Sequence, residues 1–314
     1  MNKQSRIFIA GHRGMVGSAL LRALGGAGFN NTITAAREEL DLCNTQAVEA
    51  FFRRECPDYV LLAAAKVGGI QANREFPADF IYNNLMIQTN VIHHAYLSGV
   101  RKLVFLGSSC IYPRDCPQPM KEEHLLTGPL EPTNEAYAIA KIAGMKMVQF
   151  YGQQHGLRSL TVMPCNLYGP NDSFDSRHSH VLSALVKKFV DAIDEKKDEV
   201  ILWGSGVARR EFLHVDDLAE AILFLMRKEN LPQFINVGSG TDISIRELAE
   251  LISNKVNYRG KIDWDTSMPD GMLRKCMEIS KLTKLGFRAK INLEKGIGCV
   301  IDEYRRVKGP ISSS

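Results

Sequence analysis

Two side chains four residues apart could together move a proton. Tyr137 and Lys141 lie in residues 133–141, a segment with helical spacing, so they share one face of a helix. A cation beside a phenol favours the ionised form and lowers a pKa that starts at about 10. The spacing predicts that Tyr137 donates or accepts a proton near neutral pH. Ordinary surface packing remains the alternative for this pair taken alone.

A second group of reactive side chains follows an apolar run at residues 103–107. Ser108, Ser109 and Cys110 come directly after this predicted strand. Ligands of open parallel sheets bind at the carboxyl ends of the strands, so these residues and Tyr137 could converge on one reacting carbonyl. For Cys110 the alternative is a small buried hydrophobic residue.

Glycines mark the junction between the first predicted strand and the first predicted helix. The strand at 6–10 leads into GHRGMVG (11–17), with glycines at 11, 14 and 17. Such glycines permit a tight turn, close approach of a pyrophosphate, and close packing of helix on strand. The pattern predicts a dinucleotide site, and the alternative is a glycine-rich turn without a ligand.

The residues after the second predicted strand indicate which dinucleotide is bound. NAD sites usually place Asp or Glu there, but this chain has Arg37, and Arg13 stands inside the glycine loop. Two guanidinium groups suit the 2′-phosphate of NADP better than a free hydroxyl. We therefore predict NADP(H), with Asp41 facing the adenine. The alternative is that Arg37 is simply solvated, since Glu38 and Glu39 follow it.

The elements that must position these residues alternate along the chain. Strands are predicted at 6–10, 32–36, 59–64, 103–107 and 159–164, with helices at 15–27, 45–54, 78–98 and 134–155 between them. This alternation predicts an α/β fold with a doubly wound, Rossmann-like parallel sheet. We expect a cofactor domain at 1–165, to which about 205–240 return, a smaller α/β substrate lobe over 166–308, and a disordered tail at 309–314.

Three further elements are predicted after residue 166. A helix is expected near 181–194, a returning strand at 234–237, and a helix that begins after Ser244 with a capping box and ends near Ser253.

Composition excludes several other classes of protein. The 314 residues are 45% hydrophobic with a net charge of +4, and no basic tract suggests nucleic acid as a partner. No signal peptide or membrane anchor is expected. Seven cysteines without a C-x-x-C spacing argue against disulfides and structural zinc, and favour a reducing cytoplasm. No metal is predicted.

Taken together, the glycine pattern, the serine after the fourth strand and Y-x-x-x-K resemble the extended short-chain dehydrogenase/reductase family. The resemblance implies that Ser108 hydrogen-bonds a carbonyl oxygen, that Tyr137 transfers its proton, and that Lys141 anchors the nicotinamide ribose. The cofactor-binding residues that it implies, together with those predicted above, are Gly11, His12, Arg13, Gly14, Met15, Val16, Gly17, Arg37, Asp41, Leu106, Gly107, Ser108, Ser109, Tyr137, Lys141, Pro164, Cys165, Asn166, Leu167 and His180.

A narrower resemblance is to those members of the family that epimerise and reduce GDP-4-keto-6-deoxy-D-mannose. It lies in GHRGMVG (11–17), LGSSCIYP (106–113), NLYGPND (166–172) and REFLHVDD (210–217). It implies that Cys110 and His180 are the acid and base at carbons 3 and 5, where the 4-keto group acidifies the protons. His178 is a neighbour that could exchange roles with His180, whereas His214 is expected to be structural.

The same resemblance implies the binding of the GDP-sugar substrate and the assembly of the protein. The substrate would be held by Lys188, Trp203, Arg210 and Asp270, although Trp203 could instead belong to the core of the lobe. A homodimer through the helices at 78–98 and 134–155 is expected.

Two rival functions remain open at this point. One is another nucleotide-sugar epimerase or dehydratase of the same fold. A dehydratase would need an acidic residue near Cys110, and a 4-epimerase would more often carry Asp or Glu in place of Arg37. The other is a non-catalytic NADP-sensing protein, which would have no use for a proton-transferring Tyr137.

Overall fold

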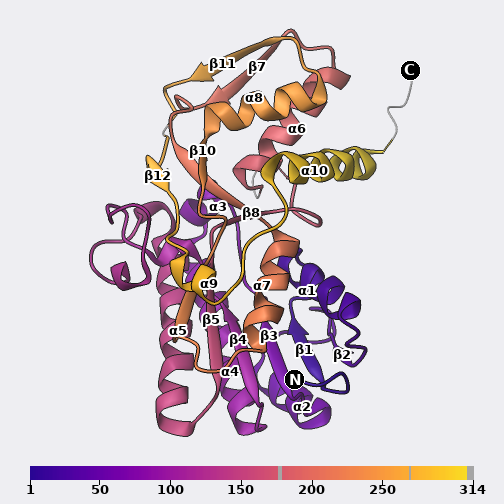
Figure 1. Cartoon of the computed structure of the whole chain (residues 1–314), viewed down its shortest axis with the longest axis vertical. Helices are drawn as coiled ribbons and strands as arrows, with labels where there is room; N and C mark the ends of the chain where they lie inside the picture. The colour runs from indigo at the N-terminus through magenta and orange to yellow at the C-terminus, as the bar shows by residue number, and fades with distance from the viewer. Residues whose placement is uncertain (176–178, 269, 310–314) are drawn as a thin grey trace.

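The centre of the molecule is a six-stranded, wholly parallel sheet (Figure 1). The computed structural model describes residues 1–175, 179–268 and 270–309. The strand order is β2-β1-β3-β4-β5-β9. The bounds are Ile7–Ala10 for β1, Thr32–Ile33 for β2, Tyr59–Leu62 for β3, Lys102–Leu106 for β4, Ser159–Pro164 for β5 and Phe234–Val237 for β9. Strands β1, β3 and β4 are buried along their whole length because helices cover both faces.

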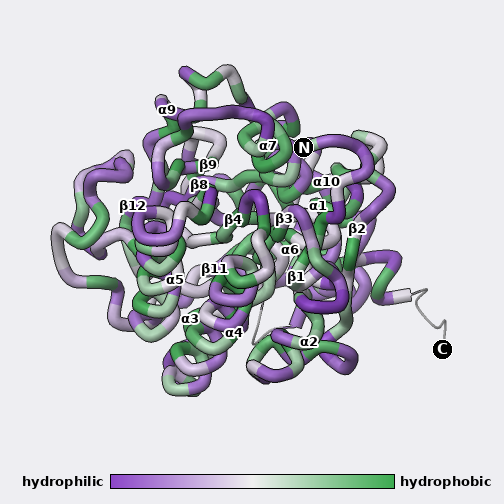
Figure 2. The backbone as a smooth tube through the Cα atoms, turned by 90° about the horizontal axis from the view of Figure 1, so that it is seen from below, coloured by the Kyte–Doolittle hydropathy of each residue, from purple (hydrophilic) through white to green (hydrophobic). Residues whose placement is uncertain are grey.

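Two groups of helices cover the sheet. Helices α2 (Thr45–Glu55), α4 (Pro77–Leu97) and α5 (Glu135–His155) pack together on one face, and α1 (Met15–Gly26) packs with α7 (Val215–Met226) on the other. The short α3 (Ile70–Glu75) precedes α4, and single 3₁₀ turns η1 (Ser109–Ile111), η2 (Glu122–His124) and η3 (Pro132–Asn134) lie between β4 and α5. Helix α2 is amphipathic, with Val48, Phe51 and Phe52 on its buried face, and Figure 2 shows both hydrophobic and hydrophilic residues along it.

The strand order reverses beside β1, which has β2 on one side and β3 on the other. Chains that leave two neighbouring strands in opposite directions open a crevice at their carboxyl ends, where doubly wound folds bind ligands. Here the glycine loop after β1 comes so near the chain after β3 that a Cβ on Gly11 would lie 2.7 Å from the Ala64 nitrogen.

A second, smaller lobe is built around β8 (Arg209–His214), which pairs antiparallel with β10 (Asp242–Ser244) and parallel with β12 (Arg274–Lys275) and β6 (Asn166–Tyr168). Strands β7 (Glu199–Trp203) and β11 (Lys261–Asp265) form a separate parallel pair. The lobe's helices are α6 (Val181–Asp194), α8 (Ile245–Val256) and α10 (Leu293–Lys308), whereas α9 (Ser280–Lys284) packs against β9. In Figure 1 this lobe stands above the carboxyl ends of the parallel strands.

The predicted fold class is confirmed, and most element bounds differ by one or two residues. The helix at 181–194 and the strand at 234–237 have the predicted bounds, and Ser244 forms the predicted capping box with Glu247. The strand predicted at 32–36 is wrong in its second half. Strand β2 ends at Ile33, because the Ala36 N–H donates to the Glu39 carboxylate and its carbonyl accepts from Leu40, which makes a turn.

The chain between 205 and 240 is divided between the two sheets. Helix α7 and strand β9 lie on the six-stranded sheet, whereas β8 is the central strand of the lobe's own sheet. Residues 310–314 of the predicted tail lie outside the described residues.

Candidate active site

Ser108 begins the site at the carboxyl end of β4. Its side-chain oxygen caps the 3₁₀ turn η1 by accepting a hydrogen bond from the Cys110 N–H at 3.2 Å. The same hydroxyl faces the Tyr137 phenol, to which it is hydrogen-bonded. The predicted convergence of strand end and helix face is therefore present, with Ser108 between the other two side chains.

Lys141 is held in the interior behind Tyr137. Its ammonium group donates to the Leu106 carbonyl at 2.8 Å and lies 5.7 Å from the centre of the Tyr137 ring. Only 4% of Lys141 is exposed, and this burial lowers the pKa of its ammonium group to about 8. The lysine is thus on the predicted face of α5, but it is directed at the strand.

The prediction that Lys141 lowers the pKa of Tyr137 is wrong for this structure. Burial raises the pKa of the phenol well above its ordinary value, the nearby Cys110 adds to this increase, and the Ser108 hydrogen bond offsets only part of it. The reason is geometric, because the Lys141 ammonium is committed to the Leu106 carbonyl. Tyr137 is accordingly a protonated donor at neutral pH.

Cys110 is half-buried and has a cationic neighbour that sequence reasoning missed. The Lys275 ammonium lies 3.4 Å from its sulfur. Burial raises the pKa of the thiol, but the Lys275 charge and the Ser108 hydrogen bond outweigh burial, so the net pKa is below its ordinary value. Lys275 is 165 residues away in sequence and reaches the site through the pairing of β12 with β8, which no local pattern indicates.

The glycine loop has the shape that a pyrophosphate needs. Gly11 has a φ of +87°, which favours glycine, and a Cβ on Gly17 would run into the Gly11 carbonyl. Helix α1 begins after Gly14, which offers no capping side chain, so the first backbone N–H groups of the helix face the loop. Because a side chain would fill this cradle, its residues fit a dinucleotide.

The two arginines predicted to select the cofactor are exposed to solvent, one within this loop and one after β2. Arg13 pairs with Glu38 at 3.1 Å, and both side chains are largely exposed. Arg37 is also exposed, and Asp41 accepts a hydrogen bond from the Cys43 N–H at 3.0 Å. Contact of Arg13 and Arg37 with a 2′-phosphate, and of Asp41 with the adenine, stays a prediction.

The other predicted cofactor residues gather at the carboxyl edge of the six-stranded sheet. Leu106 ends β4 and Pro164 ends β5, and the Gly107 N–H bridges the two strands by donating to the Val162 carbonyl at 2.9 Å. Asn166 donates from its side chain to the Glu211 carbonyl of β8 at 3.0 Å, which links this edge to the lobe. His12, Met15 and Val16 lie in the loop and first turn of α1, and Ser109, Cys165 and Leu167 follow β4 and β5.

The predictions for His178, His180 and His214 differ in how the structure bears on them. His180 is the exposed N-cap residue of α6, and no hydrogen bond or ring contact among the described residues joins it to Cys110. His178 lies outside the described residues. His214 is structural as predicted, because it is buried and its Nδ1 accepts from the Asp216 N–H at 3.2 Å, which caps α7.

The four predicted substrate residues form two adjoining pairs in the lobe. The Lys188 ammonium donates to the Ile201 carbonyl at 3.0 Å and lies 5.7 Å from the centre of the Trp203 ring. Trp203 is 62% exposed, so the alternative that it belongs to the core is wrong.

The second pair lies just beyond the end of β7. Arg210 donates to the backbone carbonyls of Met272 and Asp270. The Asp270 carboxylate accepts from both the N–H and the hydroxyl of Ser205, two residues after Trp203. Asp270 thus connects Arg210 to the turn that follows Trp203, and binding of a nucleoside diphosphate by these four residues stays a prediction.

Two kinds of feature are absent from the described part of the chain. Across residues 1–175, 179–268 and 270–309, no group of three or more His, Cys, Asp or Glu is arranged to hold a metal ion. Within the same ranges, no helix has the length and apolar character needed to cross a membrane.

Known proteins are similar to this chain over most of its length. Residues 7–238 match the profile of the NAD dependent epimerase/dehydratase family. The chain is 56% identical over 304 residues to a putative GDP-L-fucose synthase 2 of Arabidopsis thaliana, covering 97% of this chain and 93% of the relative. It is 50% identical over 306 residues to the GDP-L-fucose synthase of Escherichia coli K12, covering 95% of each.

A solved structure is also similar along nearly its whole length. It is a GDP-mannoheptose C4 reductase from Campylobacter jejuni with NADP bound, which matches with a TM-score of 0.89 and 41% identity. The match covers 97% of this chain and 99% of that one.

Proposed function

Because the chain belongs to the NAD dependent epimerase/dehydratase family, we propose that it converts GDP-4-keto-6-deoxy-D-mannose to GDP-L-fucose by NADPH-dependent 3,5-epimerisation and 4-keto reduction. The observation that carries this proposal is the position of Cys110. Carbonyl reduction alone would need Ser108, Tyr137 and Lys141, but here the Cys110 thiol, whose pKa is lowered, shares the Ser108 hydroxyl with Tyr137.

Reduction at carbon 4 uses the side chains around the end of β4. The loop with Gly11, Gly14 and Gly17 would hold NADP(H), which would supply the hydride when bound. Tyr137 donates its proton to the carbon 4 oxygen, and its high pKa in the buried site ensures that this proton is present. Ser108 donates a hydrogen bond to the same oxygen. Lys141, which fixes α5 against β4 through the Leu106 carbonyl, would anchor the ribose of the bound cofactor.

Epimerisation at carbons 3 and 5 needs one group that removes a proton and another that returns a proton to the opposite face. We assign these roles to Cys110 and His180. The 4-keto group stabilises the enolate that forms when the proton leaves. A thiol and an imidazole both exchange protons near neutral pH, since their pKa values start at about 8.5 and 6.5.

The substrate's nucleotide is assigned to the lobe. Trp203 offers its exposed ring to the guanine, while Lys188 and Arg210 offer positive charge to the diphosphate. The Asp270 carboxylate is held close to this region by the hydrogen bond that it accepts from the Ser205 hydroxyl. In this proposal the cofactor is bound by residues 1–165 together with the returning part at about 205–240. The sugar nucleotide is bound mainly by the lobe at residues 166–308.

We also propose that two copies assemble through α4 and α5 and that the enzyme works in the cytoplasm. Large apolar side chains are exposed on these two helices, namely Tyr82, Leu97, Ile139 and Phe150. Light scattering of the purified protein tests the dimer. A reducing compartment is supported by the seven cysteines, all of which are free thiols.

The deciding experiment follows NADPH absorbance with GDP-4-keto-6-deoxy-D-mannose in deuterated water, for the wild type and Cys110→Ser in parallel. We expect NADPH oxidation with deuterium at carbons 3 and 5, and loss of both in the variant. Oxidation without deuterium would instead identify a plain C4 reductase. No oxidation would favour another nucleotide-sugar enzyme of this fold or a non-catalytic NADP-binding protein.

A further inference from the structure

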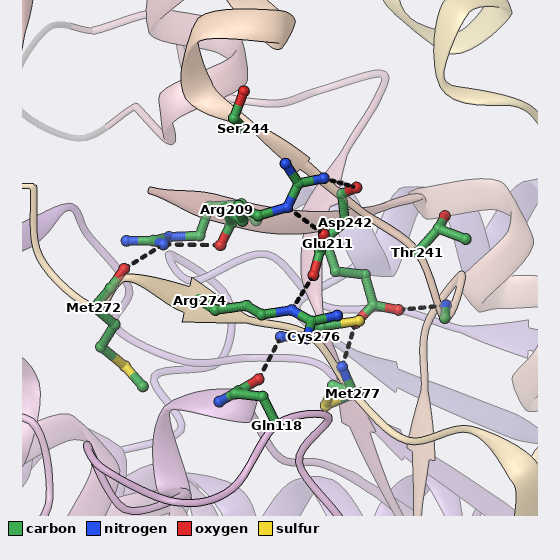
Figure 3. Close-up of polar contacts among 12 residues, drawn as sticks. Gln118, Arg209, Glu211, Thr241, Asp242, Ser244, Met272, Arg274, Cys276 and Met277 are labelled. Carbon is green, nitrogen blue, oxygen red and sulfur yellow. Dashed lines mark hydrogen bonds and ion pairs between the residues drawn. The ribbon is translucent and has the colours of Figure 1, made fainter. Parts of the chain in front are cut away.

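Lys275 reaches Cys110 because of its place on a two-residue strand. In β12 the side chains of Arg274 and Lys275 point to opposite faces, since successive residues of a strand alternate. Arg274 turns to the Asp242 carboxylate, as Figure 3 shows, which leaves Lys275 directed at the sulfur of Cys110 at 3.4 Å.

The backbone around Lys275 is held by β8 and by residues 118–120. Register pairing with β8 sets Lys275 opposite Arg210. The Cys276 N–H donates to the Gln118 side chain at 3.0 Å, and the Met277 N–H donates to the buried Glu211 carboxylate at 2.7 Å (Figure 3). The Cys276 carbonyl accepts from the Met120 N–H at 2.8 Å. These bonds fix the backbone from which the Lys275 side chain extends to Cys110.

We propose that Lys275 is a positioning residue that holds Cys110 as a thiolate aimed at the sugar. The inference deepens the proposed function and rests on it. The charged and titratable groups that face the sulfur are Lys275 from β12, Tyr137 from α5 and Glu131 from the segment before η3. Tyr137 is neutral at pH 7 and Glu131 opposes a negative sulfur, so the stabilising charge comes from Lys275, with the Ser108 hydroxyl assisting.

The proton balance of the step assigns no transfer to Lys275. The carbon–hydrogen bond breaks, its proton goes to the sulfur to form a thiol, and its electron pair moves into the enolate on the 4-keto oxygen. Lys275 remains an ammonium ion throughout. Its charge favours the thiolate before the transfer, and the thiol gives up the proton again more readily because of that charge.

The test measures the thiol itself. Alkylation of Cys110 by iodoacetamide is followed across pH by mass spectrometry of its peptide, in the wild type, Lys275→Met and Lys275→Arg. We expect the midpoint to rise by about one pH unit or more in Lys275→Met, as an opposite charge at this distance shifts a pKa. Lys275→Arg retains most of the low midpoint.

Controls separate this effect from general damage to the fold. The exposed Cys56 and Cys299 are internal references whose midpoints stay constant, and Lys284→Met removes an exposed lysine of α9 as a matched control. An unchanged Cys110 midpoint in folded Lys275→Met overturns the proposal. The proposal is also overturned if the only effect of Lys275→Met is a higher KM for the substrate, because Lys275 would then bind the diphosphate.

The alkylation result is independent of the proposed reaction. With substrate in deuterated water, the rate of deuterium incorporation by Lys275→Met is expected to fall at least tenfold, while its KM for the substrate changes much less. If the wild type incorporates no deuterium, the proposed function fails, and that outcome is read separately from the thiol midpoint.

Discussion

The Lys141 ammonium donates to the Leu106 carbonyl at 2.8 Å, so the lysine of the site is bonded to the last residue of β4 and is withdrawn from water. Burial disfavours its charge and lowers its pKa from 10.5 to about 8. A positive charge inside the protein reduces stability unless it is fully compensated.

Lys141→Met is therefore expected to abolish reduction and to stabilise the fold at pH 7. Below pH 8 both the folded and unfolded wild type carry the charge, so the folded state bears the whole cost. Between pH 8 and 10.5 the folded wild type binds fewer protons than the unfolded chain, and its stability rises with pH. The gain in the variant is thus about 1–3 kcal/mol at pH 7 and shrinks at higher pH.

Urea unfolding at pH 7 and about pH 9.5 measures this difference. Lys146→Met on the same helix is the control, since Lys146 is only partly buried and donates to Gln149 at 3.3 Å. A Lys141→Met gain that is equal at both pH values would contradict the assignment of the effect to the lysine charge.

Arg37→Ala is expected to weaken the binding of NADPH and to leave the binding of NADH almost unchanged. A hydrogen-bonded contact with a charged group contributes about 1.5–3 kcal/mol, so the KM for NADPH should rise roughly tenfold to hundredfold. Steady-state kinetics with both cofactors measure it. The exposed Arg54→Ala on α2 serves as the control, and an equal loss for NADH and NADPH would exclude contact with the 2′-phosphate.

Glu38→Gln tests the same site in the opposite direction. Glu38 pairs with Arg13 at 3.1 Å and competes with a cofactor phosphate for that guanidinium. Removing its charge should lower the KM for NADPH by up to a few fold, and added salt should reduce the difference because the pair is exposed. An increase in KM would show that Glu38 instead orients Arg13 for binding.

The two tryptophans should separate substrate binding from folding. Trp203→Ala should raise the substrate KM up to about tenfold through lost stacking, with little change in melting temperature, because the ring is 62% exposed. Trp264 packs against Gly206 and lies 4.7 Å from the Arg246 guanidinium, so Trp264→Ala should lower the melting temperature. If Trp203→Ala lowers the melting temperature as much as Trp264→Ala does, the Trp203 ring has a structural role.

Gly144→Ala should destabilise the packing of α4 on α5. A Cβ at this position would lie 2.5 Å from both the Gln88 side chain and the Phe105 ring. Forcing an extra methyl group into such a contact costs about 1–3 kcal/mol. Gly25→Ala in α1, which has open space around it, should instead be neutral or stabilising by up to about 1 kcal/mol. Thermal unfolding compares the two variants.

Local patterns predicted those parts of the molecule that depend on neighbouring residues. At Gly11 and Gly17 the backbone leaves no room for a Cβ, and the four-residue spacing of Tyr137 and Lys141 places both on one helix face. His214 was assigned correctly because a residue just ahead of two aspartates at a helix start is a cap.

Long-range geometry explains what the sequence did not reveal. The direction of the Lys141 ammonium depends on a carbonyl 35 residues away, so its effect on Tyr137 could not be inferred from helical spacing. Likewise, Lys275 approaches Cys110 only because β12 pairs with β8 in one register.

The late position of β9 also has a consequence for synthesis on the ribosome. Strand β5 has one neighbour, β4, until residues 234–237 emerge and pair with its other side. For some 70 residues of elongation the nascent chain therefore exposes an unprotected apolar strand edge, the kind of surface that recruits chaperones or aggregates. A ribosome stalled before β9 would be expected to hold an incompletely folded sheet.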